Sequence, residues 1–357
     1  MTSQSRWFVP GCALGLAMLS CFDAPPPGSP PEDIRAAANE ATIEATTAVT
    51  IDGNASGRVF DGVGAISGGG GNSRLLFDYP EPQRSQILDY LFKPGVGAAL
   101  QILKVEAGGD TNSTSGAEKS HQHIASDLNC NRGYEWWLME QAKARNPAIK
   151  LYVLAWGAPG WIGNGTFFST DMINYYVSFL DCAKNSHALT VDYLGGWNER
   201  GFDKTWYENL RSTLNSRGYS NVQVVADDTS FAPADQVVSD PAFAAAVGVL
   251  GSHYVCGYRS SQSNCPSSAN AIASGKKIWA SENGSDDFNL GAVNLARGIN
   301  RGYLDGKMTA YINWPVIAAI TPNIPFPTMG VALAAQPWSG AYSIGKKIGR
   351  ASCRERV

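Results

Sequence analysis

The chain has 357 residues, a length that suits one barrel domain of about 250 residues with short flanking segments. Charged residues make up 17% of the chain and the formal net charge is −3, which argues against nucleic acid as a partner because its binding needs clustered Lys and Arg. No apolar run reaches the roughly 20 residues that a membrane-spanning helix needs.

The first 24 residues are typical of a secretory signal. Arg6 precedes a short apolar stretch over 7–19, and Ser20 and Cys21 follow it. The residues before Cys21 also resemble, loosely, a bacterial lipoprotein site. We therefore expect export to the extracellular space or the periplasm, with a lipid anchor at Cys21 as an open alternative. Residues 25–50 show no core pattern and are expected to form a disordered linker.

Strand-like and helix-like segments alternate from residue 58 onward. The predicted strands are 58–66, 98–105, 151–156, 191–197, 222–226, 247–254, 277–282 and 308–314. Helical patterns lie between most pairs, most clearly at 81–92, 135–144, 172–184 and 206–216. This order favours a closed (β/α)8 TIM barrel over residues 51–343. After Trp314 we expect irregular chain as far as Ser343, and no final helix.

The last ten residues, 348–357, resemble the translation of a common sequencing adapter. We therefore expect the reading frame to leave its natural course near Lys347. On this interpretation the barrel is truncated near its last helix.

Four cysteines lie in the body of the chain. Cys256 and Cys265 bracket a polar loop, and in an oxidising compartment we expect them to form a disulfide. Cys130 and Cys182 either pair with each other or remain separate buried thiols. None of the four has the C-x-x-C spacing that would indicate zinc.

Two glutamates follow predicted strands. Glu199 closes the fourth strand in Trp197-Asn198-Glu199, and Glu282 closes the seventh in Ser281-Glu282-Asn283. A barrel of this type gathers the carboxyl ends of its strands at one mouth, where its chemistry lies. Two carboxylates at that mouth are what cleavage of a glycosidic bond requires, because one protonates the leaving oxygen and the other attacks or stabilises the sugar carbon.

Other residues at strand ends are candidates for the same mouth. His253 and Tyr254 end the sixth strand, where substrate contact and simple packing are both open interpretations. Tyr311 and Trp314, in the eighth strand, are expected to form an aromatic wall for a sugar face.

Three further motifs favour structural roles. Gly68–Gly71 is expected to be a tight turn rather than a phosphate loop, because no Gly-Lys-Ser/Thr follows. His121 and His123 lack a third ligand at a metal spacing, so we expect no metal. Trp136 and Trp137 lie in a predicted helix and are expected to be core residues.

Several long strings resemble glycoside hydrolase family 59, the galactocerebrosidase family. They are residues 60–65, 66–70, 79–82, 85–94 and 133–139, and the resemblance extends from about residue 59 to about residue 342. It implies a β/α barrel followed by a β-sandwich and a lectin-like domain. We expect the last two domains to be missing from this chain.

The resemblance implies a retaining β-galactosidase that needs no cofactor, with galactosylceramide as the best-known substrate. It makes Glu199 the acid/base and Glu282 the nucleophile, and it adds three sugar contacts, Thr114, Trp156 and Asn198. Retention needs carboxyl groups about 5–5.5 Å apart, and we expect Glu199 to keep a raised pKa so that it can donate a proton. Asn283 follows the nucleophile where the family carries an acidic residue.

Two alternative functions remain open. One is a β-glycosidase that acts on galactose-containing poly- or oligosaccharide. The other is a non-catalytic carbohydrate-binding protein, against which the carboxylate pair argues. The expected partner is a β-galactoside, glycolipid or glycan, with membrane contact only through a lipid substrate or the lipid anchor. Nothing in the sequence indicates an oligomeric state.

Overall fold

The computed structural model describes residues 56–70, 73–114, 116–257, 264–284, 287–318 and 329–351, together with residues 52 and 54. Apart from residues 52, 54 and 56, the described residues belong to one compact unit, Gly57–Val357. The predicted signal segment and linker lie outside the described residues, as do residues 352–357 of the predicted adapter segment. Among the described residues, no helix combines the length and the apolar character that crossing a membrane requires.

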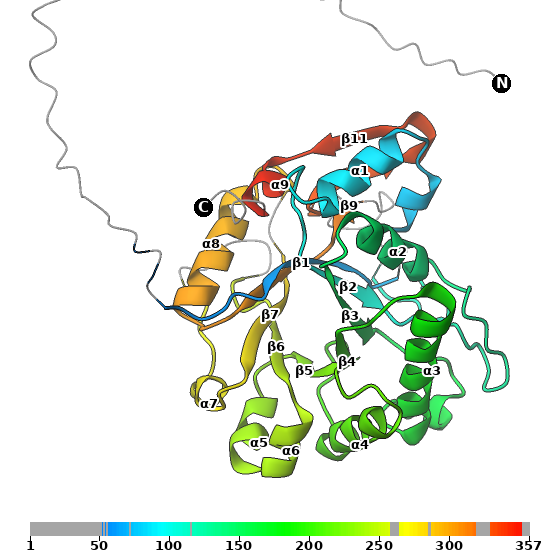
Figure 1. Cartoon of the computed structure of the whole chain (residues 1–357), viewed down its shortest axis with the longest axis vertical. Helices are drawn as coiled ribbons and strands as arrows, with labels where there is room; N and C mark the ends of the chain where they lie inside the picture. Colours follow the sequence, from blue (N-terminus) through cyan, green and yellow to red (C-terminus); the bar gives the residue numbers. More distant parts are fainter. Residues whose placement is uncertain are drawn as a thin grey trace, which may run out of the picture. The chain divides into compact units, whose positions relative to one another are not determined.

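Eight parallel strands close into a barrel in sequence order, because β1 pairs with both β2 and β8 (Figure 1). The predicted (β/α)8 TIM barrel is therefore confirmed. The first predicted strand began too early, since the ladder starts only at Gly62. The strands are β1 (Gly62–Ser67), β2 (Ile102–Glu106), β3 (Lys150–Ala155), β4 (Tyr193–Trp197), β5 (Gln223–Thr229), β6 (Val249–His253), β7 (Lys277–Asn283) and β8 (Ala310–Asn313).

The helices lie outside the strands (Figure 1). Four of them begin where a side chain accepts from a free backbone N–H, namely Ser169 at α3, Asp203 at α4, Asp240 at α6 and Ser268 at α7. The helices are α1 (Gln83–Phe92), α2 (Glu135–Arg145), α3 (Thr170–His187), α4 (Lys204–Ser216), α5 (Pro233–Ser239), α6 (Pro241–Ala246), α7 (Ala269–Ala273) and α8 (Ala292–Leu304), with 3-10 turns at η1 (Arg74–Asp78) and η2 (Ile162–Gly165).

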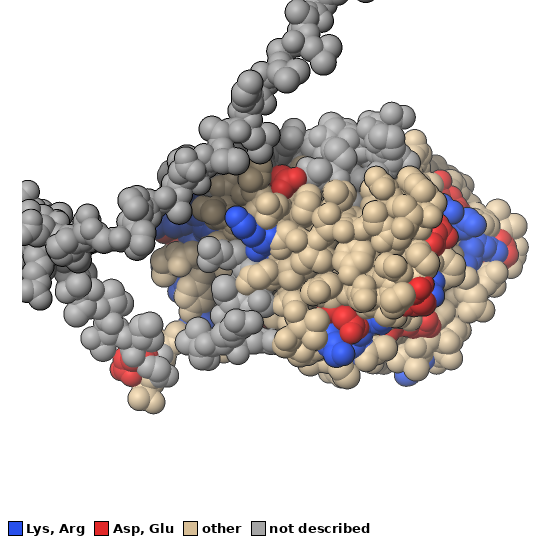
Figure 2. Space-filling model, turned by 90° about the horizontal axis from the view of Figure 1, so that it is seen from above, with Lys and Arg blue, Asp and Glu red and all other residues tan. Residues whose placement is uncertain are grey.

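Alternation of side chains along the strands creates two apolar cores. Inward residues, among them Ile102, Tyr152, Trp279 and Ile312, fill the barrel interior. Outward residues pack between the strands and the helices. The surface is sparsely charged: seen from above, Lys and Arg are interspersed with Asp and Glu over the described part of the visible face (Figure 2).

Tyr311 belongs to the outward set. Its ring packs against α8 so closely that a Cβ added to Gly298 would lie 2.7 Å from it. The prediction that Tyr311 forms a wall of the sugar site is therefore wrong. Residues three positions apart on a strand face opposite sides of the sheet, so Tyr311 cannot share a face with Trp314.

The segment after β8 is more regular than expected. It contains β9 (Ile317–Ala318), β10 (Ala332–Gln336), η3 (Pro337–Ser339), β11 (Ala341–Ile344) and α9 (Lys346–Ala351). The three strands form a small sheet in the order β11-β10-β9. The hydroxyl of Tyr79 anchors this sheet, since it donates to the Ala341 carbonyl and accepts from the Gln336 N–H. The expected irregular stretch is therefore wrong, whereas the adapter interpretation of residues 348–357 stays a prediction.

Two disulfides link the described cysteines. Cys256–Cys265 forms as predicted, and Cys130 pairs with Cys182, which settles the pairing that the sequence left open. The second bond ties the segment before α2 to α3 across 52 residues, whereas the first closes a loop across nine.

The two loop lengths lead to a stability prediction. A cross-link stabilises mainly by restricting the unfolded chain, so the longer loop should contribute more. The pair Cys130→Ser with Cys182→Ser should lower the free energy of unfolding by about 4 kcal/mol, and the pair Cys256→Ser with Cys265→Ser by about 2.5 kcal/mol. Denaturant unfolding of both double variants measures this. Equal losses, or a larger loss for the short loop, would contradict the prediction.

Candidate active site

The carboxyl ends of the barrel strands surround a pocket of about 530 Å³. Most of the residues predicted from the sequence line it: Thr114, Trp156, Asn198, Glu199, Tyr254, Glu282 and Trp314. His253 lies behind this lining and contacts both glutamates. The lining also includes Thr111, Asn112, Ser113 and Arg200, which the sequence did not single out. The structure thus brings the predicted site residues, apart from Tyr311, to one place.

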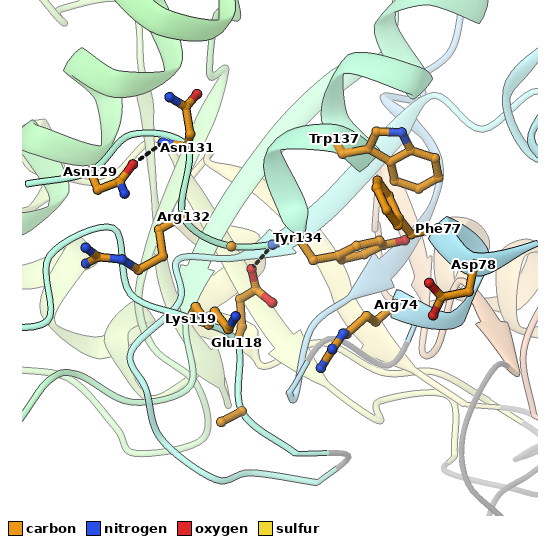
Figure 3. Close-up of a pocket in the computed structure, with 12 residues that line it drawn as sticks. Arg74, Phe77, Asp78, Glu118, Lys119, Asn129, Asn131, Arg132, Tyr134 and Trp137 are labelled. Carbon is orange, nitrogen blue, oxygen red and sulfur yellow. Dashed lines mark hydrogen bonds between the residues drawn. The ribbon is translucent and has the colours of Figure 1, made fainter.

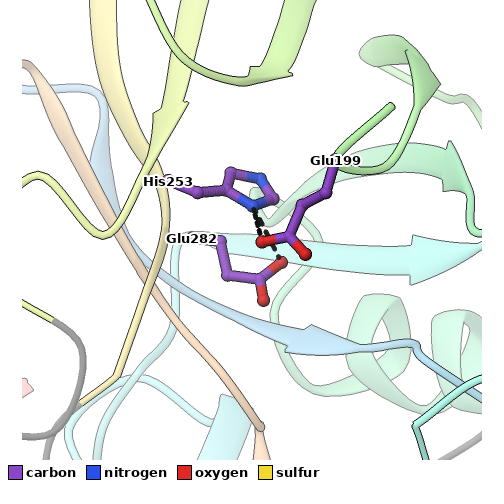
Figure 4. A group of neighbouring side chains, drawn as sticks. All are labelled: Glu199, His253 and Glu282. Atoms are coloured by element: carbon purple, nitrogen blue, oxygen red, sulfur yellow. Dashed lines mark hydrogen bonds and ion pairs between the residues drawn. The ribbon is translucent and has the colours of Figure 1, made fainter. Parts of the chain in front are cut away.

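Glu199 and Glu282 approach each other across this pocket. One oxygen of each carboxyl group and one ring nitrogen of His253 all lie within 4.8 Å of one another (Figure 4). Glu199 follows β4, its side chain is 44% exposed, and it therefore opens to the pocket. Glu282 lies in β7, beside His253 in the β6–β7 ladder, and is buried. The spacing of the two carboxylates suits retaining rather than inverting chemistry.

The two oxygens of Glu282 have different surroundings. Oε1 accepts a hydrogen bond of 2.6 Å from the Tyr254 hydroxyl. Oε2 faces two cationic side chains, with Lys104 Nζ at 3.9 Å and His253 Nδ1 at 3.7 Å, but accepts no hydrogen bond within the described part of the chain. Tyr254 therefore holds one oxygen in place, while the other is available to form a bond to carbon.

A buried ion pair in the barrel interior lies next to Glu282. Lys104 of β2 and Asp228 of β5 are both without exposed side-chain surface, and Lys104 Nζ lies 2.9 Å from Asp228 Oδ1. Lys104 also donates to the Ser281 carbonyl at 3.2 Å, and the Tyr152 hydroxyl donates to Asp228. The sequence analysis missed all three side chains. The available signal was a lysine at an inward position of a largely apolar strand.

His253 connects the ion pair to the glutamates. Its Nδ1 lies 3.1 Å from Glu199 Oε1, and its Nε2 lies 3.3 Å from Asp228 Oδ1. Both ring nitrogens therefore face carboxylate oxygens, which is the environment of a doubly protonated imidazolium. A metal ligand needs a ring lone pair, so this histidine is placed as a hydrogen-bond donor. The sequence left substrate contact and packing open for His253, and the structure shows a different role, a polar contact with both glutamates.

The pKa values of these groups are shifted together. Burial alone would lower the pKa of His253, but the carboxylates of Glu282, Asp228 and Glu199 outweigh it and raise this pKa above its usual value. The hydrogen bond from His253 lowers the pKa of Glu199, more than partial burial raises it. The expectation of a raised pKa for Glu199 is therefore wrong for this state of the site. Its cause, a histidine 54 residues away, is a tertiary contact.

The remaining predicted contacts present polar and aromatic surface to the pocket. Asn198 is buried, and its Oδ1 has no hydrogen-bond partner among the described residues, so it is available to a ligand hydroxyl. Trp156 and Trp314 contribute two indole rings, and Thr114 lines the pocket from the loop after β2. Indole faces and amide groups are what bind the apolar faces and hydroxyls of a sugar.

A second pocket, of about 510 Å³, lies beside the start of α2 and contains none of the predicted site residues (Figure 3). Aromatic side chains of Phe77, Tyr134 and Trp137 form one part of its lining. At its base Glu118 accepts hydrogen bonds from the backbone N–H groups of Tyr134 and Glu135, and so caps α2.

Glu118 belongs to a cluster of three buried carboxyl groups with Glu106 and Glu135. Glu106 accepts from the Gly70 N–H at 2.8 Å, and Glu135 accepts from the Ser67 hydroxyl at 2.8 Å, so the cluster holds the loop after β1. Burial raises the pKa of Glu106 to about 7, and nearby Glu118 adds to the effect. Burial also raises the pKa of Glu118 and, strongly, that of Glu135. These groups are protonated more readily than ordinary carboxylates.

A closed (β/α)8 barrel with two facing carboxylates at the carboxyl ends of its strands is the arrangement of a retaining glycoside hydrolase. The model of Glycosyl hydrolase family 59 matches residues 60–352. The chain belongs to this family.

Curated relatives are named galactocerebrosidase. The protein of Danio rerio is 45% identical over 297 residues, covering 82% of this chain and 44% of the relative. The human protein is 43% identical over 303 residues, covering 83% of this chain and 43% of the relative. The chain thus spans less than half the length of these relatives.

Solved structures share the fold. SrfJ from Salmonella typhimurium superposes with a TM-score of 0.66 at 13% identity, covering 83% of this chain and 74% of that one. The catalytic domain of GH30 xylanase C from Talaromyces cellulolyticus gives 0.63 at 17% identity, covering 83% and 75%. At these identities the likeness concerns the barrel alone.

The buried carboxyl cluster gives a prediction for stability against pH. Because the folded pKa of Glu106 lies above its unfolded value of 4.5, its contribution is fully present below pH 4.5 and is lost as the pH rises through about 7. Glu106→Gln removes this loss while keeping an acceptor for the Gly70 N–H. Between pH 5 and pH 8, the stability of the variant relative to the wild type should rise by about 2 to 3 kcal/mol. Denaturant unfolding at both pH values measures it.

Glu81→Gln is the matched control. Glu81 is exposed, and its pKa is lowered by a hydrogen bond from Ser85, so any change in pH dependence should be small and of opposite sign. Parallel stability curves for the wild type and Glu106→Gln would contradict the assignment.

Proposed function

We propose that this chain is the catalytic barrel of a retaining β-galactosidase that hydrolyses galactosylceramide to ceramide and galactose. The observation that carries the proposal is the carboxylate pair, whose oxygens lie within 4.8 Å of each other in a pocket at the barrel mouth. Family membership and the name of the relatives support the reaction and the galactosyl group. Contact with a membrane is needed only to reach a lipid substrate.

Glu282 acts as the nucleophile in this proposal. Its Oε2 is free of hydrogen bonds from the described residues and attacks the anomeric carbon, forming a glycosyl ester. Two cationic groups, Lys104 and His253, face this oxygen. Tyr254 holds Oε1 and orients the carboxylate plane.

Glu199 acts as the acid/base. Its partly exposed carboxyl group lines the pocket. It protonates that oxygen in the first step and removes a proton from water in the second. Asn198 binds the sugar 2-hydroxyl, and Thr114, Trp156 and Trp314 complete the sugar site.

A carbohydrate-binding protein without activity explains this site poorly. Binding a neutral sugar does not require a cluster of buried charged groups. At the barrel mouth, however, Lys104, Asp228, His253 and Glu282 are all buried and lie in contact. Burying charged groups costs free energy, and active sites are where such groups gather. A galactose-containing glycan as substrate keeps the same chemistry and differs only in the group that leaves.

Export is part of the proposal. The two disulfides fit an oxidising compartment, because cytosolic proteins rarely keep such bonds. The apolar stretch that follows Arg6 is consistent with a secretory route.

Glu282→Gln should abolish hydrolysis of 4-nitrophenyl β-galactoside and of galactosylceramide, lowering kcat by at least about 10³-fold, because an amide cannot form the glycosyl ester. For the wild type, proton NMR should show β-galactose as the first product. The measurement uses initial rates with each substrate together with the anomeric signals of the first turnovers.

Three results would contradict parts of the proposal. Release of α-galactose first would indicate inversion. Binding of galactosides without turnover would favour the carbohydrate-binding protein. Turnover of galactan but not of galactosylceramide would keep the mechanism and replace the leaving group.

A further inference from the structure

Glu199, the acid/base of the proposed reaction, must carry a proton, but its neighbour His253 favours the ionised carboxylate. Glu199 Oε1 lies 3.1 Å from Nδ1 of a buried histidine, His253 (Figure 4). The other ring nitrogen of His253 lies 3.3 Å from Asp228 Oδ1. A cationic neighbour favours the ionised carboxylate, so in the free protein Glu199 holds its own proton weakly. The proton needed for the leaving group must then be kept nearby.

We propose that His253 stores the proton that Glu199 delivers, so that the two side chains act as one general acid/base unit. The proposal rests on the proposed function. It assigns His253 a part in the reaction that neither sugar contact nor packing describes. The hydrogen bond between Nδ1 and Oε1 is the path by which the proton moves.

The proton balance closes over the two steps. In the free protein one proton is shared by His253 and Glu199, and Glu282 is a carboxylate. As Glu282 bonds to the anomeric carbon and the bond to the leaving oxygen breaks, the shared proton passes from His253 Nδ1 through Glu199 to that oxygen, which leaves Glu199 ionised and His253 neutral. In the second step Glu199 removes a proton from water, the hydroxide attacks the carbon, Glu282 leaves as a carboxylate, and the unit is reprotonated.

The charge on Glu282 controls how firmly His253 holds its proton. His253 Nδ1 lies 3.7 Å from Glu282 Oε2, and the Glu282 carboxylate is the main group that raises the pKa of this histidine against burial. Esterification removes that negative charge. The imidazolium then loses its strongest electrostatic support and gives up its proton more readily, which is the change that the reaction needs at this stage.

Every element around His253 contributes a charged or titratable group. Anions face it from three directions, namely Glu199 after β4, Asp228 of β5 and Glu282 of β7. The opposing group is Lys104 of β2, with Nζ 3.5 Å from Nε2. The neutral hydroxyls are Tyr152 of β3, which binds Asp228, and Tyr254, which binds Glu282.

Asp228 is held ionised, since Lys104 and His253 lower its pKa against the effect of burial. Asp228 therefore positions Nε2 and leaves Nδ1 to exchange with Glu199.

Histidine NMR tests the proposal on the unmutated protein. The chain has four histidines, and the ¹⁵N signals of His253 are assigned by their loss in His253→Gln. In the free protein His253 should titrate above the usual histidine range. After trapping with 2-deoxy-2-fluoro-β-galactosyl fluoride, its pKa should fall by at least about one unit, because the ester at Glu282 carries no charge. An unchanged pKa after trapping would overturn the proposal.

The same experiment separates failure of the inference from failure of the proposed function. Mass spectrometry reports whether the fluorosugar is attached to Glu282. If no ester forms there, the retaining mechanism itself fails. If the ester forms and the His253 pKa stays constant, the mechanism stands and the proton store fails.

Kinetics of His253→Gln provide a second readout. With phenyl β-galactoside, whose leaving group needs protonation, kcat/KM at pH 7 should fall by about 100-fold or more, and the basic limb of the pH profile should move down by about one unit or more. With 2,4-dinitrophenyl β-galactoside, whose leaving group needs no proton, the loss should be below about tenfold. Equal losses for both substrates with an unmoved basic limb would indicate a structural role and overturn the proposal.

Tyr254→Phe is the matched control in the same shell of the site. It removes a hydrogen bond to Glu282 rather than to Glu199. It should therefore slow both substrates to a similar extent and leave the basic limb in place. A shift of that limb in Tyr254→Phe as large as in His253→Gln would show that the limb does not report the Glu199–His253 unit.

Discussion

The ammonium group of Lys104 lies in the barrel interior with no exposed surface, and the charged part of the site is built around it. A buried cation is costly unless anions and hydrogen-bond acceptors surround it. Here Asp228, the Ser281 carbonyl and Glu282 meet that need. Asp228 in turn binds His253, and His253 binds Glu199. Removing the ammonium would leave three carboxylates around a single imidazolium, so the geometry of the reacting pair depends on a residue that does not touch the pocket.

The sequence was sufficient for the barrel and for the pair of glutamates, and the physical reason is the same in both cases. Parallel strands that are buried on both faces have nearly continuous apolar sequences, and Glu199 and Glu282 each follow such a sequence. Lys104 and Asp228 were not predicted as site residues, for two different reasons. Lys104 interrupts a predicted strand, and Asp228 follows an end predicted at residue 226, whereas β5 continues to Thr229. The pairing of a charge on β2 with one on β5 is a product of barrel closure, which single segments do not encode.

Other differences also arise from tertiary contacts. The pKa of Glu199 is lowered by His253, which reaches it only when β4 and β6 end at the same mouth. The strands β10 and β11 are short, β10 consists largely of alanine, and their sheet is held by Tyr79 from the segment before α1. Tyr311 is different, since the alternation of strand side chains would have placed it outside the barrel from sequence alone.

The turn after β1 contacts Trp156, one of the residues that line the proposed sugar site. Gly68 lies so close to Trp156 that an added Cβ would come within 2.5 Å of the indole, although Gly68 itself is not part of the pocket lining. The absence of a side chain at Gly68 therefore determines where the indole rests. A substitution at Gly68 would therefore move the indole and change the width of the cavity without replacing any charged residue of the mouth.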